Sequence, residues 1–301
     1  ADAFYKMGLI RYNQGKYDFA VTFGEKALVI RLKILKDDHP DLGSSFNNLG
    51  ISYRKKGEFG KAVECHQKAL EIRIKNLGSE NKDVASAYNN LGNSYESNGE
   101  HNKAIENKYK GLEIRLKILG EEHPDVAASY NNLGISYESK GEYSKAIEYY
   151  QKALGIRLKL FGSEHPDLAS SYNNLGNVFE SNGDYNQAIE FHQKALEIRI
   201  KSLGIEHPDV ADTYDQIGVC YNSKGEYNNA IKYKQKALEI RLKALGVEHT
   251  EVASSYHNLG NSYEFKGDYD KALEYKLKAL KIDLKNLSTG HPKFATYYNN
   301  I

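Results

Sequence analysis

The stretch "HPDVAASYNNLGISYESKG", residues 123–141, carries the pattern that decides the fold. Four of its residues share one helix face because they are spaced i, i+3, i+4 and i+7: Tyr130, Leu133, Gly134 and Tyr137. Pro124 suits the first helical turn, where its missing N–H costs no hydrogen bond, and Gly141 suits a helix end. The stretch therefore predicts one amphipathic helix with a defined start and stop.

The next stretch, "KAIEYYQKALGIRLKLFG" at 145–162, predicts a second helix. Its expected buried side consists of Ala146, Tyr150, Ala153, Leu154, Leu158 and Phe161. Ser144 is expected to cap the start of this helix, and the same place is held elsewhere by Asp18, Asn102, Asn186, Asn228 and Asp270. Gly134 and Ala146 are small, so the two helices can approach closely and form an antiparallel hairpin.

This hairpin unit recurs with a period of 42 residues. SYNNLG at 129–134 returns as SYNNLG at 171–176, AYNNLG at 87–92, SFNNLG at 45–50 and SYHNLG at 255–260, with YDQIG at 214–218 in the remaining place. The predicted repeats are 1–42, 43–84, 85–126, 127–168, 169–210, 211–252 and 253–294, with a partial repeat at 295–301. A fixed period of this length predicts a single all-α array, a right-handed superhelical solenoid of antiparallel helix hairpins. Both ends align with the interior of a repeat, which suggests a fragment of a longer chain.

The composition excludes several classes of function. Lys plus Arg (41) nearly balances Asp plus Glu (40), so no basic footprint for nucleic acid or an anionic membrane is present. The two cysteines are far apart and in no metal-binding spacing, which favours a reducing, cytoplasmic location without disulfides or zinc. No apolar run approaches the roughly 20 residues that span a bilayer. No nucleophile elbow, phosphate-binding loop or dinucleotide motif occurs, so we expect no enzyme, no cofactor and no metal.

The pattern resembles that of the tetratricopeptide repeat. The family signature, aromatic-x2-Leu-Gly-x2-Tyr followed by Ala, aromatic and Ala on the second helix, is present as Tyr130, Leu133, Gly134, Tyr137, Ala146, Tyr150 and Ala153. The usual repeat has about 34 residues, and the longer form here, with "GLEIRLKILGEEHPDVA" at 111–127, is similar to the kinesin light chain type. The resemblance covers the whole chain and implies a scaffold for protein–protein interaction.

The resemblance also places a stripe of the first helix on a concave inner wall, where the paired amides would form a column. In the family, the Asn before Leu-Gly holds the backbone of a bound peptide. Carried over, this role falls to Asn48, Asn90, Asn132, Asn174 and Asn258, with Gln216 as a near substitute. Their neighbours Asn47, Asn89, Asn131 and Asn173 extend the column, as do Asn299 and Asn300. Alternatively, these amides bond to a neighbouring repeat or face water.

Two further features of this stripe bear on a ligand. The residue after the signature glycine alternates between apolar and amide side chains: Ile51, Asn93, Ile135, Asn177, Val219 and Asn261. One turn later the stripe is mostly acidic, and only Arg54 and Lys55 are positive. We therefore expect basic or neutral peptides along the middle of the array and acidic groups near Arg54 and Lys55; drift within a duplicated two-repeat unit explains the alternation equally well.

Two other periodic features are predicted to be structural. Arg31, Arg73, Arg115, Arg157, Arg199 and Arg241 are expected to pack their stems and to pair with neighbouring acids or carbonyls. The tripeptide HPD, at 39–41, 123–125, 165–167 and 207–209, is interpreted as a helix start. Successive histidines lie a whole repeat apart, so they are not expected to share a metal.

The leading hypothesis is a non-enzymatic scaffold that binds an extended peptide in its concave groove, in the manner of cargo or adaptor recognition by kinesin light chain. The expected partner is a protein or peptide; nucleic acid and membrane insertion are not expected, and self-association stays open. Two alternatives remain: a structural spacer or self-assembling array, and the sensor arm of a multidomain signalling protein.

Overall fold

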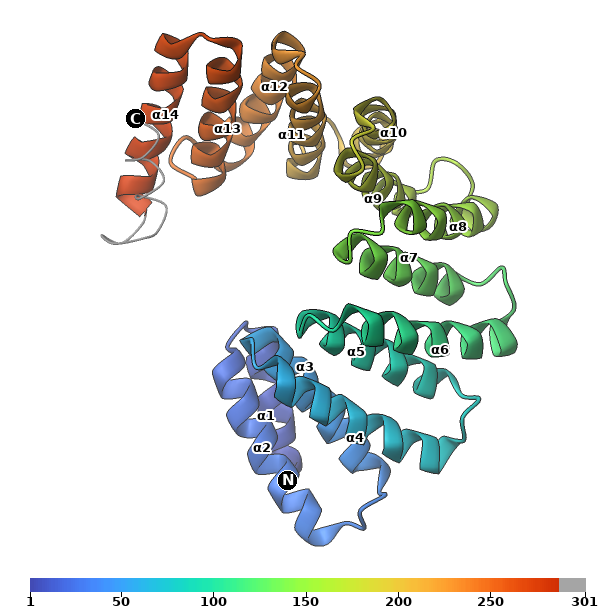
Figure 1. Ribbon diagram of the computed structural model, residues 1–301. Coiled ribbons are helices and arrows are strands. Elements are labelled where there is room, and N and C mark those ends of the chain that lie inside the picture. Colours follow the sequence, from blue (N-terminus) through green and yellow to red (C-terminus); the bar gives the residue numbers. More distant parts are fainter. Residues whose placement is uncertain (287–301) are drawn as a thin grey trace. The chain divides into compact units, whose positions relative to one another are not determined.

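The computed structural model describes residues 1–286, which form fourteen α-helices and no strand (Figure 1). The helices are α1 (Asp2–Asn13), α2 (Tyr17–Ile34), α3 (Pro40–Lys56), α4 (Phe59–Leu77), α5 (Lys82–Ser97), α6 (His101–Leu119), α7 (Pro124–Ser139), α8 (Tyr143–Phe161), α9 (Asp167–Ser181), α10 (Tyr185–Leu203), α11 (Pro208–Ser223), α12 (Tyr227–Leu245), α13 (Thr250–Lys266) and α14 (Tyr269–Asn286). The partial repeat at 295–301, with Asn299 and Asn300, lies outside the described residues.

The helices belong to two compact units, Ala1–Leu160 and Phe161–Ile301. In the first unit α1 packs on α2, α3 on α4 and α5 on α6, and the second helix of each hairpin contacts the first helix of the next. In the second unit α9 packs on α10, α11 on α12 and α13 on α14, with the same contacts between successive hairpins. The predicted all-α array of helix hairpins is therefore confirmed.

The signature residues hold each hairpin together. Leu133, Leu175 and Leu259 are completely buried between the helices. Gly134 lies directly against the second helix, because a Cβ built on it would stand 2.6 Å from the Tyr150 ring. No real Cβ tolerates such a distance, so the glycine sets how closely the two helices approach.

The HPD tripeptide is confirmed as a helix start. Its histidine is the N-cap of α3, α7 and α11, whereas α9 begins at Asp167 with Pro166 as its N-cap. His39, His123, His207 and His249 each accept a hydrogen bond at Nδ1 from the backbone N–H two residues later, at 3.1–3.2 Å. Asn81 does the same through its side-chain oxygen, at 2.8 Å. The array therefore tolerates His or Asn here because both offer an acceptor at the same reach.

The predicted caps of the second helices are wrong. α8 begins at Tyr143, so Ser144 already lies in its first turn, and the equivalent residues of the other repeats are displaced in the same way. The cap is one residue earlier than the helix start; in α10 it is Asp184, which accepts a hydrogen bond from the backbone N–H of Gln187 at 3.1 Å. Because the turn after the glycine is short, each second helix begins before the polar residue predicted to cap it.

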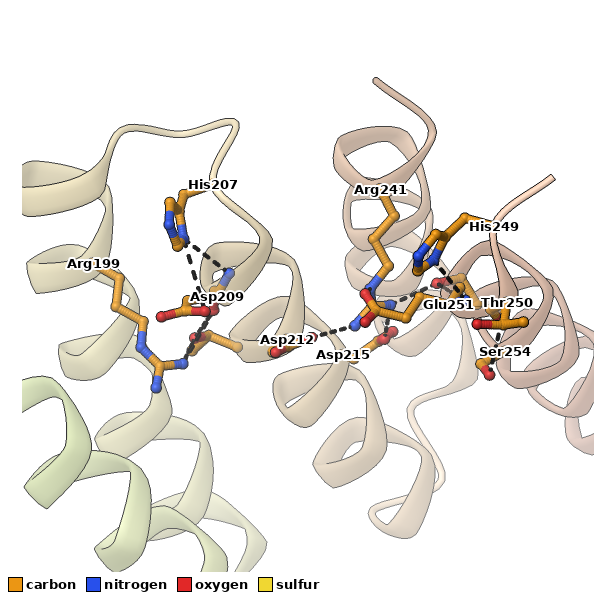
Figure 2. A network of polar contacts seen from close by, with 12 residues as sticks. Arg199, His207, Asp209, Asp212, Asp215, Arg241, His249, Thr250, Glu251 and Ser254 are labelled. Atoms are coloured by element: carbon orange, nitrogen blue, oxygen red, sulfur yellow. Dashed lines mark hydrogen bonds and ion pairs between the residues drawn. The ribbon is translucent and has the colours of Figure 1, made fainter. Parts of the chain in front are cut away.

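The periodic arginines bond to neighbouring first helices, as predicted. Arg31 donates to the backbone carbonyl of Asp41 at 3.0 Å, and Arg199 to that of Asp209 at 3.1 Å. Arg241 lies between the carboxylates of Asp212 and Asp215 (Figure 2). These cations therefore bond to backbone carbonyls near helix starts and to carboxylates of neighbouring helices, which is a structural role.

Candidate peptide-binding site

The paired amides of the first unit bond to one another across repeats. The Nδ2 of Asn90 donates to the Oδ1 of Asn47 at 3.0 Å, and the Nδ2 of Asn132 donates to the Oδ1 of Asn89 at 2.9 Å. Asn48 makes the equivalent bond, again to a residue 43 positions earlier: its side chain donates to the hydroxyl of Tyr5 at 2.5 Å. The second amide of each pair therefore reaches back to the preceding hairpin, and the first amide receives the next one.

These bonds leave capacity for a ligand. An asparagine amide has two N–H donors and two acceptor lone pairs, and the cross-repeat bond uses one N–H. Asn90 and Asn132 are half-buried, and their side-chain oxygens make no hydrogen bond within residues 1–286. The amides thus link the hairpins and still present a donor and an acceptor at the surface.

The second unit departs from this pattern. Asp215 and Gln216 stand where the second to fifth repeats have two asparagines, and Asp215 pairs with Arg241. The side-chain oxygens of Asn173 and Gln216 are buried, and neither has a hydrogen-bond partner in the described part of the chain. The longer Gln216 and the charged Asp215 therefore interrupt the amide series between α9 and α13.

The other predicted ligand-binding residues lie on the first helices at various depths. Ile135 and Lys55 are exposed. The half-buried members are Ile51, Arg54, Asn93, Asn131, Asn174, Asn177, Asn258 and Asn261. Asn47 is buried at the same surface. Every one of them is on the helix that the sequence pattern assigns to it.

Sequence reasoning placed Tyr150 on the buried side of its helix but missed the polar residues that hold the same place on the other second helices from α4 onward. One turn after the small residue of α4, α6, α8, α10, α12 and α14, a side chain packs on the signature glycine of the same repeat, so that a Cβ on that glycine would meet it at 2.5–3.0 Å. We call this place the glycine-facing position; it holds His66, Lys108, Tyr150, His192, Lys234 and Lys276, all at most 3% exposed. The signal that could have revealed it is a polar residue recurring every 42 positions in an apolar stripe.

Most of these buried groups have polar partners from neighbouring first helices. Lys108 pairs with Glu96 at 2.7 Å and donates to the hydroxyl of Ser136 at 2.7 Å. The hydroxyl of Tyr150 donates to Glu138 at 2.6 Å. Burial raises the pKa of the Glu138 carboxyl, and the hydrogen bond from Tyr150 opposes this rise.

The first repeat has Gly24 at the glycine-facing position, and a cavity of about 190 Å³ lies there. Gly8, Ala20 and Gly24 form part of its lining, so the space corresponds to the side chain that the other repeats supply. The rest of the lining comes from Tyr5, Leu9, Tyr12, Asn13, Ser45, Asn48, Leu49, Ile51 and Ser52. We call this cavity the α1–α3 socket; its lining includes two predicted ligand-binding residues, Asn48 and Ile51.

Across residues 1–286, no helix combines the length and the apolar character that crossing a bilayer requires. No curated protein matches the sequence. Among solved structures, the nearly identical repeats of a protein described as a kinesin light chain from Podosopora anserina are 27% identical, with a TM-score of 0.62, and the match covers 69% of this chain and 98% of that one.

Two more distant structures share the fold. BtubC from P. vanneervenii is 24% identical with a TM-score of 0.62, and the match covers 78% of this chain and 92% of that one. A signal transduction ATPase with a tetratricopeptide repeat sensor from Pyrococcus horikoshii is 20% identical with a TM-score of 0.67, covering 94% of this chain and 41% of that one. The sequence itself matches the tetratricopeptide repeat model over residues 1–75, 83–159, 141–201, 167–227 and 209–285. The chain therefore belongs to the tetratricopeptide repeat family.

Proposed function

We propose that this protein is a non-enzymatic scaffold that binds an extended peptide segment of a partner protein along the first helices of its hairpins. The α1–α3 socket is the observation that carries the proposal. An apolar side chain of the peptide enters the socket, and the amides of Asn48 and Asn90 hold the peptide backbone beside it.

The socket has the size and lining of an anchor site. Its volume of about 190 Å³ exceeds the roughly 150 Å³ of an apolar protein cavity that binds benzene. Burying a Leu or Phe side chain contributes about 1.5–3 kcal/mol, and each backbone hydrogen bond adds about 0.5–1.5 kcal/mol. Set against the cost of ordering the peptide, one anchor and a few such bonds correspond to roughly micromolar affinity.

Charge beside the socket narrows the choice of peptide. Arg54 and Lys55 follow Ile51 by about one helical turn on α3. An acidic residue next to the apolar anchor would lie near these two cations, and opposite charges at short range favour the complex. We therefore propose a peptide with one large apolar residue and an acidic neighbour.

The likeness to kinesin light chain repeats makes cargo or adaptor recognition the specific role that we propose. The preference for a scaffold over an enzyme rests on the same family, whose members generally hold partners rather than catalyse reactions. Cytoplasmic residence belongs to this proposal.

The decisive experiment fills the socket with a residue that the array itself uses. Gly24→His places at the first repeat the side chain found in the second repeat, and it should weaken peptide binding at least about tenfold, because the anchor loses its site. Binding is measured by fluorescence anisotropy with peptides selected on an array. Gly155→His is the matched control, since nothing lies within 4 Å of a Cβ at that exposed helical glycine.

Circular dichroism must show that Gly24→His retains its helices. If the folded variant binds as tightly as the unmodified chain, the socket takes no part in recognition. A further pair of variants tests the amides: Asn48→Ala should weaken binding, whereas Asn186→Ala, at an exposed asparagine on the second helix α10, should leave it unchanged.

A further inference from the structure

Three metal-binding residue types meet at the glycine-facing position of the second unit. Glu180 on α9, His192 on α10 and Cys220 on α11 each place one ligand atom within 4.8 Å of the others. His192 and Cys220 are completely buried, and Glu180 is half-buried. The three residues come from three successive helices, so their spacing in the sequence does not resemble a metal-binding motif.

In other repeats, residues at the equivalent three positions are joined by hydrogen bonds. In the third repeat the equivalent residues are Glu96, Lys108 and Ser136, and the lysine bonds to both partners at 2.7 Å. In the second repeat, the Nδ1 of His66 lies 2.7 Å from the hydroxyl of Ser94. The hydroxyl of the following repeat thus completes the polar contacts of the buried group.

His192 lacks this completion. Neither of its ring nitrogens has a hydrogen-bond partner among residues 1–286, although the side chain has no exposed surface. Cys220 stands where Ser94 completes the contacts of His66, so a weak donor replaces a strong one. A completely buried imidazole with both nitrogens unpaired is costly, and an ion that binds one of them would remove part of that cost.

We propose that Glu180, His192 and Cys220 bind a transition-metal ion of the Zn²⁺ class. Thiolate, imidazole and carboxylate are the three donor types that zinc takes from proteins, and hard cations such as Mg²⁺ do not select sulfur and nitrogen. Bonds of about 2.0–2.3 Å in a tetrahedral site separate the ligand atoms by roughly 3.4–3.6 Å. Side-chain rotations that shorten the distances between the three ligand atoms by about 1 Å would therefore produce this geometry.

The remaining features of the cluster fit an ion bound in this way. Three protein ligands leave the fourth position of a tetrahedral ion for water or another ligand, on the side of the partly exposed Glu180. Burial, together with the nearby Glu180 carboxylate, raises the pKa of the Cys220 thiol to about 12. A divalent cation opposes both effects by stabilising the thiolate. The bound ion would link α9 and α10 of one hairpin to α11 of the next.

The test uses Co²⁺ as a spectroscopic substitute for Zn²⁺. The 301-residue chain is treated with a chelator, freed of it and titrated with Co²⁺ while the near-ultraviolet absorption is recorded. We expect a thiolate-to-cobalt charge-transfer band that saturates at one ion per chain and disappears when Zn²⁺ is added. Cys220→Ser should abolish the band and weaken Co²⁺ binding at least about 100-fold, because the sulfur ligand is lost.

The chain supplies matched controls. Serine is the natural residue at 94, 136 and 262, so Cys220→Ser is compatible with the fold. Cys65→Ala removes the other thiol and should leave the band intact, and Glu180→Gln should weaken binding without abolishing the band. The proposal fails if the unmodified chain shows no band, if the band survives in Cys220→Ser, or if it depends on Cys65 instead.

Discussion

Lys234 should destabilise the protein at neutral pH, and removing its charge should stabilise the fold. Its side chain is 3% exposed, and its Nζ donates to the backbone carbonyl of Asn258 at 3.2 Å. Lys108, at the same position, pairs with Glu96 twelve residues earlier, but the corresponding residue for Lys234 is the neutral Asn222. Burial therefore lowers the pKa of Lys234 to about 8, against the opposing influence of a nearby acid.

The size of the effect follows from this shift. One pKa unit corresponds to about 1.36 kcal/mol, so a fall from 10.5 to about 8 corresponds to a cost of roughly 3 kcal/mol for holding the lysine charged. Below pH 8 the folded and unfolded chains both carry the proton, and the full cost applies. Between pH 8 and 10.5 only the unfolded chain is protonated, so the free energy of unfolding rises with pH. Above this range both forms are neutral and the cost is gone.

Lys234→Met keeps the length and the apolar stem of the side chain. It should raise the free energy of unfolding by about 1–3 kcal/mol at neutral pH. This gain should shrink as the pH approaches 10.5, the ordinary pKa of a lysine amine. Urea unfolding followed by circular dichroism, repeated at several pH values, measures both quantities. Lys108→Met is the control and should instead lower stability by about 3 kcal/mol, because the half-buried Glu96 loses its ion-pair partner.

Two results would refute this reasoning. One is a Lys234→Met variant that is less stable than the unmodified chain at neutral pH. The other is a stability difference that does not change with pH, since only a titrating amine produces the predicted slope. Asn222→Glu gives an independent check: a carboxylate at that place should raise the pKa of Lys234 and stabilise the fold.

Three further predictions concern the repeat itself. Asn132→Ala should cost about 1 kcal/mol, and a double-mutant cycle with Asn89→Ala should show a coupling of about 0.5–1.5 kcal/mol; additive losses would contradict the cross-repeat bond. His123→Ala should lower the free energy of unfolding by about 1 kcal/mol through loss of the N-cap, while His123→Asn should retain most of it; thermal melts that rank the two equally would exclude the capping role. Gly134→Ala should cost about 1–3 kcal/mol by overpacking against the Tyr150 ring; a urea midpoint that does not fall would show that the helices can separate at no cost.

The helical hairpins could be predicted from the sequence because the deciding information is local and repeated. The i, i+3, i+4, i+7 spacing around Leu133 defines a helix face, and the 42-residue period requires that every hairpin bury that face in the same way. The prediction was weaker at helix starts. Ser144 suggested a cap, but the tight turn after the preceding glycine makes the helix begin two residues earlier, at Tyr143.

The candidate site was only partly predictable. The paired asparagines were recognised as a column, but their direct bonds, such as Asn132 to Asn89, depend on how far one hairpin stands from the next. The α1–α3 socket is visible in the sequence only as a glycine at position 24. That this glycine leaves a cavity becomes clear only from the large side chains that occupy the same place in the other repeats.

Sequence alone determined that the chain is an array of helix hairpins in which small residues, above all the signature glycines, allow close packing. Helix periodicity and capping act over a few residues and repeat without change, so they can be recognised without coordinates. Tertiary structure alone decided which polar groups meet: the amide pairs, the buried lysines, and the cluster of Glu180, His192 and Cys220. Each of these contacts joins different helices, and its partners are therefore set by the packing distance between helices rather than by spacing along the chain.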